Sequence, residues 1–412
     1  MKEYPIITIS IINFNDHKFI FKAIESAVSL DYPNLDIIIT DNNSTDGTRE
    51  EIGNRLIGWK EERKKIAEKY LHINAVNEIR YIKNDGNFGF GRPHNEAIRQ
   101  AKGEFILPLN SDAILSPDYL LNALGSFSDD RVGAVQGKLL RYDFDKNELY
   151  KSKSDKSLNV IDTTGLMMLK NRRIVCIGQG EADQGQFEEK KEIFGVDGAV
   201  PVYRMKALED VKMTILSPKS IMSKVHKVEN PESNNKLQAT CLPPACRQGR
   251  DRQASYKLSG YEFFDEDFFM YKEDVDLSWR LRLYGWKAVY DPRAVAYHGR
   301  GSGDSMATNY ISIIRERRKI NARAKFLSFK HQRLMQIKCD MPGLLFTKHF
   351  PDFIIKEIGA WAYMAIFERF TLRVLKDLYR DVPKFIKKRK MVMKGKRSGA
   401  AEMERWFMQI KS

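Results

Sequence analysis

Three carboxylates stand at the start of a segment whose apolar residues recur with helical spacing. They are Glu273, Asp274 and Asp276, and the apolar residues that follow are Val275, Leu277, Leu281 and Leu283, ahead of Gly285. The pattern predicts a helix that begins near Asp274 and ends before the glycine. A carboxylate there accepts backbone N–H bonds at the positive helix end, so it is held ionised and fixed in direction, as a general base requires. The alternative is that all three acids only cap the helix.

Charge and composition narrow the class of protein. The chain has 412 residues, is 42% hydrophobic and carries a net charge of +15 from 69 basic and 54 acidic residues. It is therefore globular, and its charge favours a polyanionic partner: nucleic acid, an anionic membrane surface or a phosphorylated substrate.

The cysteines and the hydropathy of the chain indicate the cellular compartment in which the protein is expected. The four cysteines, Cys176, Cys241, Cys246 and Cys339, form neither a disulfide framework nor a zinc-site pattern, so reduced thiols in a cytoplasmic protein are expected. No signal-peptide pattern is present. The most apolar helical stretch, Ile358 to Phe367, falls short of the roughly 20 residues that a membrane span needs.

Four apolar runs predict parallel strands, each followed by a polar loop. The runs are Ile6–Ile12, Leu35–Thr40, Ile79–Lys83 and Glu104–Leu109, and the loops begin at Asn13, Asp41, Asn84 and Asn110. Helical patterns between the runs make this an α/β chain. Ligands of such sheets bind beyond the carboxyl ends of the strands, so the four loops are the expected nucleotide site. A turn and helix cap is the other interpretation of Asn43 to Thr48.

Two residues at strand ends have the chemistry of a metal or phosphate site. Asp112 follows the fourth strand, and hard cations such as Mg²⁺ or Mn²⁺ take carboxylate oxygens and share them with substrate phosphates. His298 ends a later pair of short strands, Lys287–Asp291 and Ala294–His298, ahead of a glycine-rich turn. For each, a purely structural role is the alternative: a helix cap for Asp112 and a buried histidine for His298.

The remainder of the chain divides into two regions of different composition. Residues from Met213 to Leu258 lack periodicity and contain four prolines, which indicates a long insertion or loop. From Tyr310 onward the pattern is helical, basic and aromatic. Such helices either lie in an anionic membrane interface or pack against the rest of the protein, and the sequence leaves both open.

Five ordered motifs together resemble glycosyltransferase family 2, and within it the rhamnosyltransferase-like branch. They are Ile9–Asn15, Asp41–Thr48, Gly86–Gly91, Leu109–Asp112 and Phe264–Leu277, and the resemblance covers roughly Ile6 to Ile320. Two features depart from the family pattern. Asn110-Ser111-Asp112 keeps only the final carboxylate of the Asp-X-Asp form, and the insertion between Tyr203 and Tyr261 is longer than usual.

The resemblance implies a GT-A fold: a Rossmann-like, mostly parallel sheet with flanking helices, a nucleotide-sugar donor, Mg²⁺ or Mn²⁺, and inversion at the anomeric carbon. It places Asp274 as the base that deprotonates the acceptor, and Asp112 with His298 at the metal. The donor contacts that it implies are Asn13, Asp41, Asn43, Asn87, Gly89 and Asn110.

The sequence as a whole predicts a catalytic domain over residues 1–310, with an insertion at about 211–258, and a basic, amphipathic helical region over 311–412. The expected reaction moves L-rhamnose from dTDP-L-rhamnose to a lipid-linked or polysaccharide acceptor in cell-surface glycan synthesis, at the inner membrane face. Alternatives are a galactofuranosyl or other hexosyl donor carried by UDP, and a non-catalytic basic adaptor for membranes or nucleic acid. For the enzyme, an anionic membrane is an expected partner and nucleic acid is not.

Overall fold

A computed structural model describes residues 4–70, 76–215, 260–299 and 310–408 of the chain. The four predicted strands are present as β1 (Ile7–Asn13), β2 (Leu35–Asp41), β3 (Asn77–Lys83) and β4 (Phe105–Leu109), and they pair in parallel in the order β4-β1-β2-β3. β1, β2 and β4 are buried on both faces, with every residue of β2 buried, whereas most residues of β3 are only half-buried. Asn13 lies opposite Asp41 in the register, so the polar loops meet at one edge.

The sheet continues beyond β4 through β12 (Val202–Arg204), β6 (Val132–Asp143), β15 (Lys287–His298) and β11 (Lys191–Ile193). β5 (Ala113–Leu115), β7 (Glu148–Leu149) and β8 (Ile161–Thr163) pair at its side. Smaller sheets join β9 (Leu166–Leu169), β10 (Ile174–Cys176) and β16 (Phe407–Met408), and β13 (Met213–Thr214) with β14 (Tyr261–Glu262). The two short strands predicted around Pro292 are one strand, β15, with a register shift between Asp291 and Val295.

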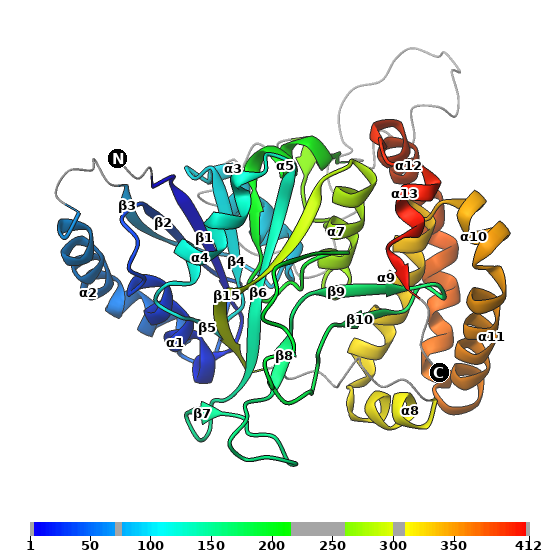
Figure 1. The fold of residues 1–412 in the computed structure, drawn as a ribbon, viewed down its shortest axis with the longest axis horizontal. Coiled ribbons are helices and arrows are strands. Elements are labelled where there is room, and N and C mark those ends of the chain that lie inside the picture. Colours follow the sequence, from blue (N-terminus) through cyan, green and yellow to red (C-terminus); the bar gives the residue numbers. More distant parts are fainter. Residues whose placement is uncertain (1–3, 71–75, 216–259, 300–309, 409–412) are drawn as a thin grey trace, which may run out of the picture.

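Helices flank this sheet and form a separate group at the C-terminal end (Figure 1). The flanking helices are α1 (His17–Val28), α2 (Thr48–Glu68), α3 (Gly91–Gln100), α4 (Tyr119–Leu124), η1 (Gly125–Ser128), α5 (Met205–Val211) and α7 (Glu273–Leu283). The C-terminal group is α8 (Tyr310–Lys319), α9 (Ala322–Cys339), α10 (Pro342–Lys348), α11 (Phe350–Phe367), η3 (Arg369–Arg373), α12 (Val374–Gly395) and α13 (Ala400–Glu404). The predicted α/β class with a helical C-terminal region is confirmed.

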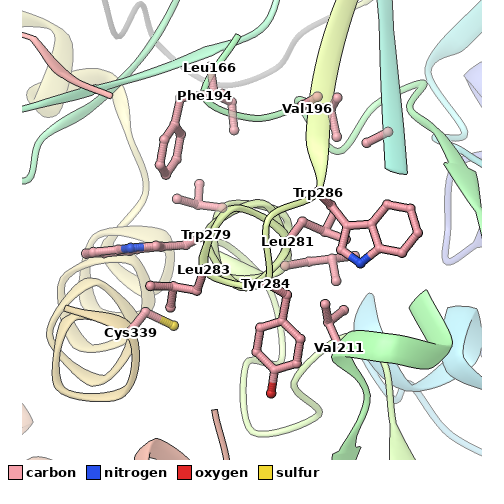
Figure 2. Packing of buried hydrophobic residues seen from close by; sticks show 14 of the residues in the cluster. Leu166, Phe194, Val196, Val211, Trp279, Leu281, Leu283, Tyr284, Trp286 and Cys339 are labelled. Atoms are coloured by element: carbon pink, nitrogen blue, oxygen red, sulfur yellow. The ribbon is translucent and has the colours of Figure 1, made fainter. Parts of the chain in front are cut away.

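Helix α7, which carries Asp274, is enclosed by core residues from distant parts of the chain. Figure 2 shows Trp279, Leu281 and Leu283 of α7 with Phe194 on one side and Cys339 of α9 on another. Every residue of α7 except Asp274 is therefore buried, and the helix packs against both the sheet and the C-terminal helices.

Lysines of the C-terminal helices neutralise the acidic residues around α7. Lys338 of α9 contacts Asp265 and lies 2.7 Å from Asp276. Lys388 of α12 contacts Asp265 and lies 2.6 Å from Glu262. These side chains are almost fully buried, so the C-terminal helices pack against the rest of the protein. The division at residue 310 stays a prediction.

Several expectations fall on or beside parts of the chain that are not described. Residues 216–259, with Cys241, Cys246 and nearly all of the predicted insertion, lie outside the described residues, and β13 pairs with β14 at its two ends. Cys176 and Cys339 are buried, and neither forms a disulfide within the described residues. None of the described helices is long and apolar enough to cross a membrane.

Candidate active site

The predicted nucleoside contacts Asn13 and Asp41 form one buried polar group at the ends of β1 and β2. The Asn13 amide nitrogen donates to Asp41 at 2.9 Å and to the Ser44 hydroxyl at 2.8 Å. The other Asp41 oxygen accepts the backbone N–H groups of Asn43 and Ser44, each at 3.1 Å. Because the Asn13 nitrogen faces these acceptors, its amide oxygen points elsewhere, and that buried oxygen accepts no hydrogen bond from the described residues.

Asn43 lies in the left-handed region with φ 68° and accepts a 2.9 Å hydrogen bond from Arg49. Arg49 also donates to the carbonyl of Asn84 at 2.8 Å and lies 3.6 Å from Asp41. The guanidinium therefore joins the loops after β2 and β3 beside the buried carboxylate. Sequence reasoning did not identify Arg49, which lies in the first turn of α2 and not in the polar loop before it.

The glycine-rich loop is fastened to two neighbouring segments. The Asn42 amide donates to the Gly89 carbonyl at 3.0 Å, and the Asn87 side chain accepts the Gly89 N–H at 2.9 Å. Gly89 has φ +75°, and a Cβ there would lie 2.1 Å from the carbonyl oxygen of Phe269. Glycine is therefore required by the close approach of this loop to the segment before α7, whether or not it contacts a ligand.

Replacing Gly89 with alanine should destabilise the protein by about 1–3 kcal/mol, because the new Cβ meets a backbone carbonyl and the left-handed conformation is strained. Gly86→Ala is the matched control in the same loop, since a Cβ there meets only the Phe88 ring, at 3.7 Å. Urea unfolding of both variants measures the difference. Equal stability of the two would contradict the close approach of Gly89 to Phe269.

The structure brings Asp112 and His298 together and adds Asp162 to them. The Nε2 atom of His298 lies 3.2 Å from Asp112, and its Nδ1 atom lies 2.8 Å from Asp162. Burial by itself lowers the pKa of His298, but Asp112 and Asp162 outweigh it and raise the pKa to about 10. Burial raises the pKa of Asp112, and His298 reverses this, so the pKa falls below its ordinary value. The imidazole is thus a cation between two carboxylates, and a metal ion bound at Nε2 would take the place of the proton on that nitrogen.

This donor set fits a hard divalent cation as part of a shared site. Asp112 offers carboxylate oxygens, and a histidine whose far nitrogen is held by a carboxylate is a common arrangement around protein-bound metals. Among the described residues, no three His, Cys, Asp or Glu side chains are grouped so as to hold an ion. An ion at Asp112 and His298 would therefore need further oxygen ligands from a bound substrate or water.

Asp274 lies in the first turn of α7 and receives two backbone hydrogen bonds. Its oxygens accept from Gly198 at 3.2 Å and from Val275 at 2.8 Å. Lys272, with φ 79°, precedes the helix and continues a left-handed turn from Tyr271, with φ 70°. Burial, and then the negative charge of Asp197, raise the pKa of Asp274 to about 6.

One short segment connects the Asp112 loop to Asp274. The backbone N–H of Asn110 donates to the carbonyl of Ala199 at 2.9 Å, and the neighbouring Gly198 donates to Asp274. A Cβ on Gly198 would lie 3.2 Å from that of Asp274, so the contact is close. Residues 198–199 therefore connect the predicted base to the loop that carries the predicted metal ligand.

Asp162 and Asp197 were not predicted from the sequence. Asp162 ends up beside His298 although it is separated from it by 136 positions. Asp197 accepts the N–H of Ala199 at 3.0 Å, and its own N–H donates to Gln136 at 2.7 Å. Asp162 stands on β8 and Asp197 lies between β11 and β12, and only contacts with distant segments bring the two residues to the site.

A cavity of about 350 Å³ opens beside the glycine-rich loop. It is lined by Asn87, Phe88, Arg92, Ile215, Glu262, Glu266, Asp267, Phe269, Lys384 and Lys388. It thus lies between that loop, the acidic segment before α7 and helix α12. Asn87 is the one predicted donor contact among its lining residues.

The chain matches the model of a known family, described as "Glycosyl transferase family 2", over residues 8–57 and 58–211. The match covers β1 to α5, including Asn13, Asp41 and Asp112, and ends before α7.

Curated proteins give a consistent but more distant similarity. Poly-beta-1,6-N-acetyl-D-glucosamine synthase of Staphylococcus epidermidis is 22% identical over 285 residues, which are 69% of this chain and 47% of that protein. The poly(ribitol-phosphate) beta-N-acetylglucosaminyltransferase TarS of Staphylococcus aureus is 29% identical over 119 residues, 28% of this chain and 18% of that protein. The chain thus spans about half the length or less of these relatives.

Among solved structures, the mannosyltransferase PcManGT of Pyrobaculum calidifontis, in complex with GDP-Man and Mn²⁺, resembles the chain with a TM-score of 0.42. The two sequences are 15% identical, and the alignment covers 98% of this chain and 88% of that one.

Proposed function

Residues 8–211 belong to glycosyl transferase family 2, and from this premise we propose that the protein is an inverting, metal-dependent glycosyltransferase that uses a nucleotide-sugar donor. The observation that carries the proposal is the connection through residues 198–199. Gly198 donates to Asp274, and Ala199 accepts from Asn110, two residues before Asp112. This connection supports a base and a diphosphate site close to each other, which a direct displacement requires.

Asp274 acts as the base in this scheme. Its carboxylate takes the proton of the acceptor hydroxyl, while the acceptor oxygen forms a bond to the anomeric carbon and the bond to the donor's diphosphate breaks. The electron pair of that bond leaves with the nucleoside diphosphate. The two N–H donors at Gly198 and Val275 fix the direction of the carboxylate.

Asn13 and Asp41 hold the nucleoside. The amide oxygen of Asn13 is buried and has no donor among the described residues, so it offers an acceptor to the N3–H of a pyrimidine base. Asn43, Asn87 and Asn110 lie in the loops at the same sheet edge and remain predicted donor contacts, as does Gly89 through its backbone.

Asp112 and His298 would hold Mg²⁺ or Mn²⁺, which supplies positive charge to the leaving diphosphate when bound. Asp162 fixes the orientation of the His298 ring, so that Nε2 faces Asp112. Phosphate oxygens of the donor and water would occupy the remaining ligand positions of the metal ion.

The donor sugar is proposed as L-rhamnose from dTDP-L-rhamnose, which rests on the resemblance of the five motifs. A UDP-linked hexose is the second candidate, including galactofuranose. It is favoured by two relatives whose names specify N-acetylglucosamine. Both donors carry a pyrimidine, so the Asn13 contact accepts either.

The acceptor is proposed as a lipid-linked glycan or a polysaccharide at the inner membrane face. Support comes from the relatives, since one is named as the synthase of a polysaccharide and the other as an enzyme that acts on poly(ribitol-phosphate). The +15 net charge is also suited to an anionic membrane beside such an acceptor. A non-catalytic adaptor is disfavoured, because Asp41 and Asp112 follow neighbouring strand ends and residues 198–199 connect the Asp112 loop to Asp274.

Release of nucleoside diphosphate from a panel of dTDP- and UDP-sugars with Mn²⁺, with and without a membrane extract as acceptor, tests the proposal. We expect release from one donor, stimulated by the extract and abolished by EDTA. Release of pyrophosphate instead would identify a sugar nucleotidyltransferase and reject the proposal.

Replacing Asp162 with asparagine should weaken Mn²⁺ binding by about 10- to 100-fold, because the His298 ring loses the carboxylate that orients it. Titration of the protein with Mn²⁺, followed by electron paramagnetic resonance, measures the affinity without any turnover. Asp155→Asn, at an exposed turn, is the control. An unchanged affinity in Asp162→Asn would remove His298 from the metal site.

The transfer rate should rise with pH through about 6 and then level off, because Asp274 accepts a proton only when it is ionised. The negative charge of Asp197 contributes to the raised pKa of Asp274, so Asp197→Asn should move the midpoint to lower pH. A pH profile of kcat/KM for both proteins measures this. A profile that rises only near pH 4, the ordinary range of an aspartate, would contradict burial of the base.

A further inference from the structure

Helix α11 has its apolar and charged residues on the opposite faces from those of an ordinary surface helix. Between Phe353 and Phe367 its exposed positions are all apolar: Ile355, Ile358, Gly359, Ala362, Ala365, Ile366 and Phe367. Ile355, Ile358, Ile366 and Phe367 are each at least 60% exposed. This outer face of α11 is a continuous stripe along the helix, because the positions recur at steps of three and four.

The charged residues of α11 in the same span point inward. Glu357 is buried and forms an ion pair with Arg333 of α9, whose guanidinium nitrogen lies 2.6 Å from the carboxylate. Lys356 contacts Glu357, and its side chain is only 20% exposed. The inner face also packs Trp361 against Phe329, with ring centres 5.1 Å apart. The orientation of α11 is therefore fixed by specific contacts, which keep the apolar stripe outside.

Aromatic and cationic residues border this stripe. Phe346 and Phe350 are exposed before and at the start of α11, and Phe370 is exposed just after it. The cations Arg369, Arg373 and Lys376 follow on η3 and α12, are exposed, and form no ion pair within the described part of the chain. An apolar helix face with aromatic ends and unpaired cations matches the boundary between headgroups and acyl chains of an anionic bilayer.

We propose that the outer face of α11 lies in the plane of an anionic membrane, with Arg369, Arg373 and Lys376 against lipid phosphates. Charge decides between this occupant and a second copy of the chain. Two copies meeting through this face would bring the same unpaired cations, in a protein of net charge +15, against each other. An anionic surface neutralises them. This inference goes beyond the catalytic proposal and does not require turnover.

Co-sedimentation with vesicles of equal parts phosphatidylglycerol and phosphatidylcholine tests the proposal. The double variant Ile358→Glu, Ile366→Glu should lower the partition coefficient by about tenfold or more, because two exposed apolar side chains that would enter the membrane become charged. Ile57→Glu is the matched control, since Ile57 of α2 is 70% exposed on another helix, and it should bind as the unmodified protein does. The triple variant Arg369→Gln, Arg373→Gln, Lys376→Gln should reduce binding and its sensitivity to salt.

The proposal is overturned if the unmodified protein does not sediment with the vesicles, or if Ile57→Glu loses as much binding as the α11 variant. It is also overturned if analytical ultracentrifugation shows a dimer that the α11 variant converts to monomer. Donor-induced thermal stabilisation, measured on the same variant, shows whether the nucleotide site is intact. Loss of vesicle binding with that response preserved separates this face from the catalytic site.

Discussion

Asp274→Asn is expected to lower the transfer rate by about 10²–10⁴-fold while donor binding stays nearly unchanged. The amide keeps the size of the carboxylate but does not take a proton from the acceptor. Donor contacts are assigned to other residues, so calorimetric titration with the donor should give a similar dissociation constant. Steady-state measurement of nucleoside diphosphate release with acceptor present gives the rate.

Asp130→Asn is the control for this substitution, because the Asp130 side chain is 95% exposed. It should retain full activity. Near-normal turnover by Asp274→Asn would remove this residue from the mechanism. Loss of donor binding together with activity would instead assign Asp274 to the donor site.

Lys388→Met is expected to destabilise the folded protein by about 3–5 kcal/mol, because it leaves buried carboxylates without their partner. Lys388 of α12 lies 2.6 Å from Glu262 and 2.8 Å from Asp267, and it also contacts Asp265. Burial alone lowers the pKa of Lys388, but the charges of Asp265 and Glu262 raise it above its ordinary value. Denaturant unfolding at neutral pH measures the loss.

The preceding residue supplies a matched control. Lys387 is exposed and makes no ion pair with the described residues, so Lys387→Met should change stability by no more than about 0.5 kcal/mol. Equal effects of the two substitutions would show that α12 is not anchored through the acidic segment before α7. The result also concerns the predicted base, because the segment anchored by these lysines contains Asp274. Lys338 of α9 contacts Asp265 and Asp276, which stand before and after Asp274 in the sequence.

The sheet and its polar edge could be predicted because their signals are local. Runs such as Leu35 to Asp41 have a β-branched centre, Ile37 to Thr40, as is typical of a strand buried on both faces, and a polar loop follows each run. Helix α7 was predicted from its spacing and its glycine, although it is buried on all sides. Asp41 and Asp274 were found because they stand directly beside these elements.

The rest of the site depends on pairing between distant segments, which one sequence does not reveal. Asp162 stands on the three-residue strand β8, and nothing near it in the sequence points to His298. The basic run of α12 likewise does not show in the sequence which lysine is buried. Lys388 is buried and forms ion pairs, whereas the adjacent Lys387 is exposed. The alternatives for the C-terminal helices were both open because one face packs and another is exposed.

Equilibrium binding of nucleotide sugars tests the central claim most directly. Thermal unfolding is measured with dTDP-L-rhamnose and a set of UDP-sugars, each with and without Mn²⁺, because a ligand that binds only the folded state raises its Tm. We predict that one donor raises the Tm, that Mn²⁺ enlarges the effect, and that Asp112→Asn removes the enlargement. No shift with any donor, together with salt-sensitive binding of nucleic acid, would contradict the account and support a non-catalytic adaptor.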